Sequence, residues 1–249
     1  MVGGAAAVLT RARWAALGGL LVALGLYDAL AGELPAFPGR WDVAFVSLVV
    51  LPAAFGVPWL LLPARDQRWV LPAALALAGI SVLLYFAGLG VLFNLSKLVG
   101  LVFFGYWFMI LFERLSFVVL IAAIIPVVDS VSVWRGPTEY VVEEQPGIFD
   151  RVSIAFRVPG EEGSANLGPP DLIFFALFLG AAARWGLRPG WTWVAMTGLL
   201  ALTLIGTVVL DVRGLPALPA VAIGFIAANA DLLWQELRAN RLRGQTPGV

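Results

Sequence analysis

The sequence predicts an all-α membrane protein, a polytopic bundle of transmembrane helices. Of its 249 residues, 61% are hydrophobic and only 13% are charged, and the mean hydropathy is +0.92. Soluble proteins average about 45–50% apolar and about 25% charged residues. Because a transmembrane helix needs about 20 mainly apolar residues, this chain has room for about eight such helices with short loops.

Eight apolar runs in the sequence are candidates for these helices. They are residues 14–32, 43–62, 69–93, 98–113, 116–134, 171–187, 190–210 and 215–234. Backbone polar groups find no water in lipid, so we expect these runs to be helical. The first run also has features of a signal peptide, with Arg11 and Arg13 before it and Ala29-Leu30-Ala31 near its end. Cleavage there would leave seven spans.

The runs divide the chain into three expected regions. Residues 1–114 contain about four transmembrane helices, residues 115–236 form a core, and residues 237–249 form a basic C-terminal tail. The core includes a long polar loop, residues 135–170. Within it, residues 148–158 (IFDRVSIAFRV) partly alternate and are rich in β-formers, which predicts one strand or a small hairpin at the membrane surface.

Positive charges are distributed unequally between the two ends of the expected helices. With eight spans, one side has ten Arg residues and the other has five Arg residues and Lys97. Lys and Arg are enriched in cytoplasmic loops, so both termini are expected in the cytoplasm and the loop 135–170 outside. Arg outnumbers Lys fifteen to one, and Ala and Gly are abundant, which suggests a GC-rich prokaryotic genome.

Several classes of chemistry are excluded by residues that the sequence lacks. It has no His and no Cys. It therefore has no Ser-His protease site, no HExxH zinc site, no haem bound through His and no thiol nucleophile. The net charge is zero, which gives no electrostatic support for a nucleic-acid partner. Any catalysis must rely mostly on carboxylates, hydroxyls and the backbone, and we expect no metal and no cofactor.

Acidic residues inside the expected helices are the main functional candidates, because an ionisable group at membrane depth is costly. Asp129 lies deep in the run 116–134, shortly after Pro126. Asp171 begins the next run, where the helix dipole favours an ionised carboxylate. The acidic candidates are Asp28, Asp129, Asp171 and Asp231, whereas Glu113 and Asp211 lie at the ends of runs, where an interfacial position is expected.

The runs that contain Asp129 and Asp171 are joined by one loop, so they are expected to be antiparallel neighbours with facing carboxylates. Two facing carboxylates share a proton, since both cannot easily ionise. One can then deprotonate water while the other polarises a peptide carbonyl, as aspartic proteolysis requires. From these features alone, a proton relay in a transporter explains the two residues equally well.

A third feature favours proteolysis. The last run begins with Pro216-Ala217-Leu218-Pro219, after an intramembrane Asp129 and an Asp171 preceded by Gly168. This ordered set resembles the presenilin and signal peptide peptidase family of intramembrane aspartyl proteases, in particular its archaeal and bacterial presenilin-like branch. The resemblance covers about residues 115–236.

The resemblance implies a role for each of these residues. Asp129 and Asp171 would be the catalytic pair that activates water without a metal or cofactor. The substrate would be a single-span membrane protein or a remnant signal peptide, met within membrane lipid. The residues expected to contact the substrate are Gly168, Pro216, Ala217, Leu218 and Pro219.

The sequence departs from the family pattern at two positions. Val128 stands where the family has Tyr, and Pro170 stands where it has a second Gly. Pro fixes φ and lacks an N–H, so we expect Pro170 to narrow substrate choice or to alter the alignment of Asp171. The family also has nine spans, one more than the runs found in this sequence. Two alternatives remain open: an inactive presenilin-like scaffold, and a proton-coupled transporter that uses the same aspartates.

Overall fold

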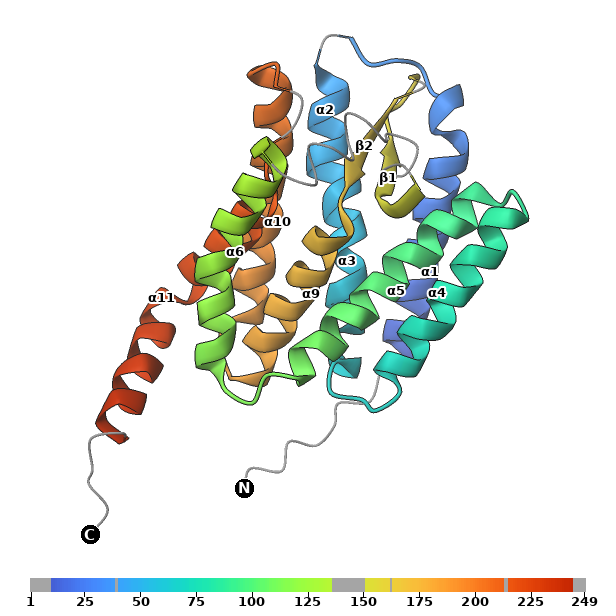
Figure 1. Cartoon of the computed structure of the whole chain (residues 1–249). Coiled ribbons are helices and arrows are strands. Elements are labelled where there is room, and N and C mark those ends of the chain that lie inside the picture. Colours follow the sequence, from blue (N-terminus) through green and yellow to red (C-terminus); the bar gives the residue numbers. More distant parts are fainter. Residues whose placement is uncertain (1–9, 39, 136–150, 162, 213–214, 244–249) are drawn as a thin grey trace.

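The computed structural model describes residues 10–38, 40–135, 151–161, 163–212 and 215–243. Over these residues the protein is an all-α bundle with one small hairpin, which confirms the predicted fold class (Figure 1). Six of the described helices are long and apolar enough to cross a membrane. The chain is therefore an integral membrane protein. The acid-rich part of the predicted loop, residues 136–150, lies outside the described residues.

The N-terminal half consists of antiparallel helices with short turns. Helix α1 is capped by Thr10, whose Oγ1 atom accepts a hydrogen bond from the backbone N–H of Arg13. Helices α2 and α3 form one continuous span through a π-helical turn, which ends next to Pro52. Because Pro lacks an N–H, the regular i→i−4 bonding cannot continue there. The elements are α1 (Arg11–Leu30), η1 (Ala31–Glu33), α2 (Trp41–Phe45), η2 (Val46–Val50), α3 (Leu51–Leu61), η3 (Leu62–Ala64), α4 (Val70–Phe86) and α5 (Gly90–Ile110).

The boundary between α4 and α5 differs from the predicted one. The apolar run 69–93 is broken at Gly88, which has a φ of +72°. The N–H of Leu89 donates to the carbonyl of Leu84 at 3.0 Å, a bond that closes helix C-termini around such a glycine. Helix α5 therefore begins at Gly90, eight residues before the predicted start. The prediction that Lys97 lies in a loop is wrong, because Lys97 is inside α5.

In the C-terminal half, the described residues form four helices and the hairpin. The hairpin is antiparallel and pairs Ile154 with Leu167 and Phe156 with Ala165. The predicted hairpin is present, but the strand does not extend over the whole of 148–158: residues 151–153 are not extended, and residues 148–150 are outside the described part. The elements are α6 (Leu115–Arg135), β1 (Ile154–Arg157), β2 (Ser164–Leu167), α9 (Pro169–Arg184), α10 (Pro189–Val209) and α11 (Leu218–Arg243).

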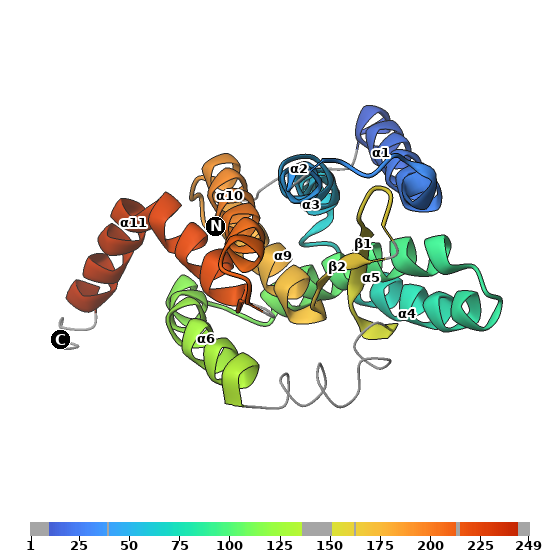
Figure 2. The same cartoon turned by 90° about the horizontal axis from the view of Figure 1, so that it is seen from above.

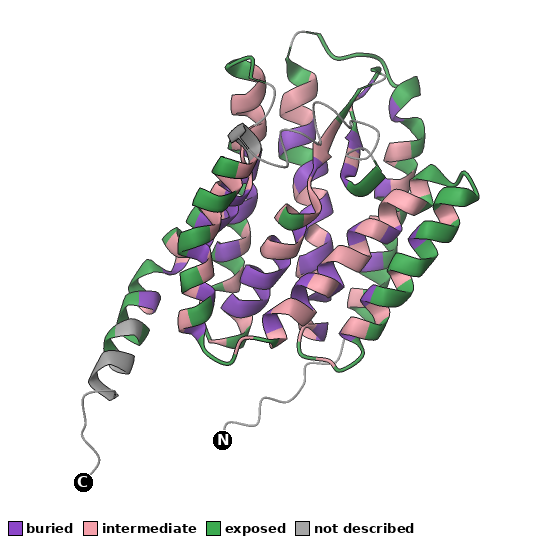
Figure 3. Cartoon of the chain, in the orientation of Figure 1, coloured by how far each residue is buried: buried purple, intermediate pink, exposed green. Residues whose placement is uncertain are grey.

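Helix α9 is the centre of the bundle. Figure 2 places it among α3, α5, α10 and α11, with α6 beside α11 at one side. A continuous stretch of α9, from Phe175 to Ala182, is buried, and Figure 3 shows burial concentrated in these central helices. Phe175 stacks on Phe55 with ring centroids 4.1 Å apart, and Phe178 stacks on Phe225 at 4.9 Å. A helix that is apolar on all sides suits this central position.

The central helix is also shorter than α5, α10 and α11, the helices on which it mainly packs. With 16 residues, α9 is about 24 Å long, whereas α10 has 21 residues and is about 31 Å long. Strand β2 runs down from one end of the bundle and leads directly into α9 (Figure 1). The hairpin therefore occupies the space above α9, and the start of α9 is recessed from the end of the bundle.

Helix α11 extends beyond the predicted last run and ends at Arg243, so the first part of the predicted tail is helical. Its C-terminal end lies at the same end of the bundle as the start of α1 (Figure 1). This arrangement fits an even number of spans.

Candidate active site

Asp129 lies on α6 and contacts the first turn of α11. Its Oδ2 atom accepts a hydrogen bond from the backbone N–H of Leu218, with 3.1 Å between nitrogen and oxygen. The first N–H groups of a helix have no partner within the helix, and a helix N-terminus attracts negative charge. Helix α6 packs chiefly against α11, which supports this contact. The structure thus brings a predicted catalytic residue to the segment that begins the last helix.

The residue before Asp129 does not take part in this contact. Val128, where the family pattern has Tyr, is 53% exposed on the outer face of α6. Ser130, on the other side, donates a hydrogen bond from its hydroxyl to the carbonyl of Pro126 at 2.7 Å. Pro126 has no N–H to donate to the carbonyl four residues before it, so one helical hydrogen bond is missing in the turn before Asp129.

Asp171 lies in the first turn of α9. Gly168 is the N-cap residue, and its backbone N–H donates to the Oδ2 atom of Asp171 at 3.1 Å. The N–H of Asp171 donates in turn to the carbonyl of Gly168 at 3.1 Å. A Cβ atom on Gly168 would lie 3.1 Å from Oδ2 of Asp171, a tight contact that glycine avoids. Gly168 therefore orients the Asp171 carboxylate through both its backbone and its lack of a side chain.

Pro169 and Pro170 occupy the first two positions of α9. These positions need no backbone donor within the helix, and the fixed φ of Pro suits them. Asp171 keeps its bond to Gly168, so the structure gives no sign of the altered alignment that we expected from Pro170.

We expect Pro170→Gly to loosen the start of α9 without removing this bond. The substitution increases the freedom of the unfolded chain and should lower the free energy of unfolding by about 1 kcal/mol. If Pro170 narrows substrate choice, the variant should also cleave a wider set of reporter sequences. Thermal unfolding in detergent and a panel of single-span reporters would measure the two effects. A variant that is as stable and as selective as the wild type would contradict this role for Pro170.

The segment predicted to line the cleft is partly helical. Leu215 and Pro216 are irregular and Ala217 lies in a bend, but α11 begins at Leu218. Because two Pro residues cannot donate backbone hydrogen bonds, the sequence predicts irregular backbone from Leu215 to Pro219, and this prediction is wrong for Leu218 and Pro219. The reason is that Pro is well tolerated in the first turn of a helix. The irregular part is therefore short and ends at the N–H that binds Asp129.

The two aspartates lie at the starts of two helices that pack against each other. Asp129 binds the first turn of α11, Asp171 lies in the first turn of α9, and α11 packs against both α6 and α9. Each has one oxygen bound to a backbone N–H at the start of a helix, Asp129 at α11 and Asp171 at α9. Both helix N-termini therefore direct positive potential at the same region.

An apolar groove of about 330 Å³ opens beside Pro170, the residue next to Asp171. It lies between α5 and α9, and its lining has no polar surface. Its lining residues are Phe104, Trp107, Phe108, Leu111, Pro170, Ile173 and Phe174. A hydrophobic segment can therefore bind in this groove beside α9 without removing water from polar groups of the protein.

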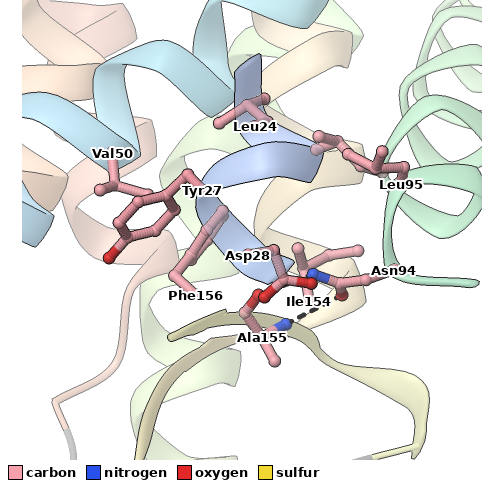
Figure 4. Close-up of a pocket in the computed structure, with 10 residues that line it drawn as sticks. Leu24, Tyr27, Asp28, Val50, Asn94, Leu95, Ile154, Ala155 and Phe156 are labelled. Carbon is pink, nitrogen blue, oxygen red and sulfur yellow. Dashed lines mark hydrogen bonds between the residues drawn. The ribbon is translucent and has the colours of Figure 1, made fainter. Parts of the chain in front are cut away.

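Side chains that the sequence analysis did not single out hold the hairpin above this site. Asn94 on α5 binds both backbone groups of Ala155 in β1, and the hydroxyl of Tyr27 donates to the carbonyl of Arg157. Figure 4 shows Tyr27, Asp28 and Asn94 gathered against β1, around a cavity of about 20 Å³. The only feature of the sequence that could have indicated these contacts is the presence of polar residues such as Asn94 and Tyr27 within apolar runs.

The other two acidic candidates lie outside the aspartate pair. Asp28 on α1 is half-buried and forms an ion pair with Arg157 at 3.6 Å. Asp231 on α11 forms two hydrogen bonds of 2.7 Å with Arg188, in the turn before α10. These bonds raise the pKa of the Arg188 guanidinium above its usual value. Both acids therefore connect elements of the fold.

No protein-family model matches the sequence of this chain, and no curated protein matches it.

Proposed function

We propose that the protein is an intramembrane aspartyl protease of the presenilin-like type. The observation that carries the proposal is the hydrogen bond from the Leu218 N–H to Asp129, at the start of a helix, α11, that also packs against α9. The bond joins two of the three features whose order in the sequence resembles that family, and α9 carries the third, Asp171. A scaffold or a transporter would not require the start of α11 to contact one of the two carboxylates.

In the proposed mechanism, Asp129 and Asp171 share one proton and one water molecule. The ionised carboxylate removes a proton from the water, whose oxygen attacks the carbonyl carbon of the peptide bond. The protonated carboxylate donates its proton to the carbonyl oxygen, which gives a neutral tetrahedral diol. The carboxylate that has gained a proton then gives it to the amide nitrogen, while the other carboxylate takes a proton from one hydroxyl of the diol. The carbon–nitrogen bond breaks, which gives a carboxylic acid and an amine and leaves the pair with one shared proton. The backbone bonds from Gly168 and Leu218 keep both carboxylates oriented throughout.

The proposed substrate is an apolar single-span segment, such as a membrane protein or a remnant signal peptide. The apolar groove beside Pro170 suits such a segment, because it is free of polar surface. A transmembrane helix must unwind before a peptide bond becomes accessible, and the unwound backbone needs new hydrogen-bond partners in lipid. The hairpin that precedes α9 can supply them by strand addition.

We also propose that the protein lies in a prokaryotic cell membrane with both termini in the cytoplasm. The unequal distribution of Arg between the two ends of the helices supports this orientation. The aspartates would then open toward the extracytoplasmic side, where the hairpin lies.

Cleavage of a tagged single-span reporter tests the proposed function. The purified protein and the reporter would be reconstituted together in liposomes, and the products identified by mass spectrometry. The proposal predicts new termini within the apolar segment of the reporter, formed without added metal or cofactor. Uptake of a solute driven by a proton gradient, with no cleavage of any reporter, would instead establish a transporter.

A further inference from the structure

The outer edge of β1, on the side away from β2, is bound by side chains. Helices α1 and α5 provide Tyr27, Asn94 and Lys97, which we call the side-chain edge. Every second carbonyl from Arg151 to Arg157, along this edge and the residues just before it, accepts a hydrogen bond from one of them. The accepting carbonyls belong to Arg151 and Ser153, bound by Lys97, to Ala155, bound by Asn94, and to Arg157, bound by Tyr27.

Asn94 binds Ala155 in the manner of a neighbouring strand. Its Nδ2 atom donates to the Ala155 carbonyl at 2.7 Å, and its Oδ1 atom accepts from the Ala155 N–H at 3.1 Å (Figure 4). A residue of an adjacent strand would offer the same donor and acceptor. The spacing of every second residue is also that of a strand edge.

The side-chain edge lies within α1 and α5, both of which are long enough to cross a membrane. Irregular or extended backbone at that depth persists only when its polar groups are satisfied. The Lys97 ammonium group donates to the carbonyls of Arg151 and Ser153 and lies 4.2 Å from the centre of the Phe93 ring. Three costly polar side chains are thus placed where the backbone groups of one strand edge would otherwise lack partners.

The hairpin transmits this support to the aspartate pair. Because Ala155 directs both backbone groups at Asn94, the bonds between the strands fall on the neighbouring pairs, Ile154 with Leu167 and Phe156 with Ala165. Leu167 is followed directly by Gly168, which caps α9 and binds Asp171. A shift of β1 would therefore move the residues that orient Asp171.

We propose that the side-chain edge replaces a missing strand: it closes the outer edge of β1 and fixes the hairpin in register with Asp171. Asn94 is a positioning residue in this arrangement. The inference rests on the proposed protease function, since it assigns to Asn94 the positioning of the hairpin that leads into the catalytic Asp171.

Asn94→Leu tests the inference, because Leu has nearly the same volume and lacks the two polar groups. Asn94→Ala serves as a second variant if the first does not fold. The matched control is Ser96→Ala, two residues away on α5, where the Ser96 hydroxyl pairs with that of Ser81 at 2.7 Å. Hydrogen exchange of the hairpin, measured by mass spectrometry, reads the position of β1 whether or not the protein cleaves anything.

For Asn94→Leu we expect hairpin amides, residues 154–167, to exchange about tenfold faster than in the wild type. Reporter cleavage should spread over neighbouring bonds and KM should rise at least about threefold, because the register is no longer fixed, while kcat changes less. Ser96→Ala should match the wild type in all three measurements. Unchanged exchange, or an unchanged cleavage position and KM, would overturn the inference. If the wild type itself cleaves no reporter, the proposed function fails, and the exchange result still shows whether Asn94 holds the hairpin.

Discussion

Asp129→Asn and Asp171→Asn should each reduce reporter cleavage by at least about 10³-fold. Asn has the shape of Asp and its amide oxygen still accepts a hydrogen bond, so the bonds from Leu218 and Gly168 can persist. It cannot take up or release the proton that the mechanism needs. The loss of activity should therefore occur without loss of helix content or of thermal stability, as measured by circular dichroism in detergent.

Asp231→Asn is the matched control for these two variants. Asp231 also lies on a membrane-spanning helix, but it pairs with Arg188 in the turn before α10 and makes no contact with the aspartate pair. This variant should cleave the reporter at the wild-type rate. Activity within about tenfold of the wild type in either Asp129→Asn or Asp171→Asn would be too high for a general acid or base and would contradict the proposed chemistry.

Gly105→Ala should destabilise the protein strongly. A Cβ atom on Gly105 would lie 2.5 Å from the carbonyl oxygen of Ile173 and 2.8 Å from the Cβ atom of Ala176. Small residues allow such close crossings of helices in membranes. Helices α5 and α9 would have to move apart, and we expect the free energy of unfolding to fall by about 2–3 kcal/mol. Because the crossing lies two residues from Asp171, activity should also fall.

Gly198→Ala provides the comparison for Gly105→Ala. Gly198 is on α10, and an added Cβ atom there would meet nothing within 4 Å. Ala is the better helix former by up to about 1 kcal/mol, so this variant should be as stable as the wild type or more stable. Equal stability of the two variants in a denaturant titration would mean that α5 and α9 do not cross as closely as the structure has them.

The sequence was sufficient to predict the bundle, because its apolar runs are long and interrupted by clear polar turns. It misled at the end of α4, where the apolar run continues through Gly88 although the backbone turns there with a φ of +72°. The second strand, Ser164–Leu167, has little apolar alternation. It forms because it pairs with β1, which Asn94 holds in place. Pairing of this kind depends on residues far apart in the chain.

The candidate site could be predicted only in part. The order of Asp129, Asp171 and the Pro216–Pro219 segment was readable, whereas the bond between Leu218 and Asp129 joins residues 89 positions apart. The side-chain edge was not predicted, since Asn94 and Tyr27 bind backbone groups 61 and 130 positions away. Contacts between residues so far apart in the chain are visible only in the three-dimensional structure.

Binding of a transition-state analogue is the most direct test of whether Asp129 and Asp171 form one catalytic pair, because it does not depend on finding the natural substrate. A peptide with a hydroxyethylene group in place of the scissile bond offers one hydroxyl to a pair of aspartates. We expect saturable binding to the wild-type protein and to Asp231→Asn. In both Asp129→Asn and Asp171→Asn, the affinity should fall at least about a hundredfold. Equal affinity for all four proteins would mean that Asp129 and Asp171 do not form one catalytic site.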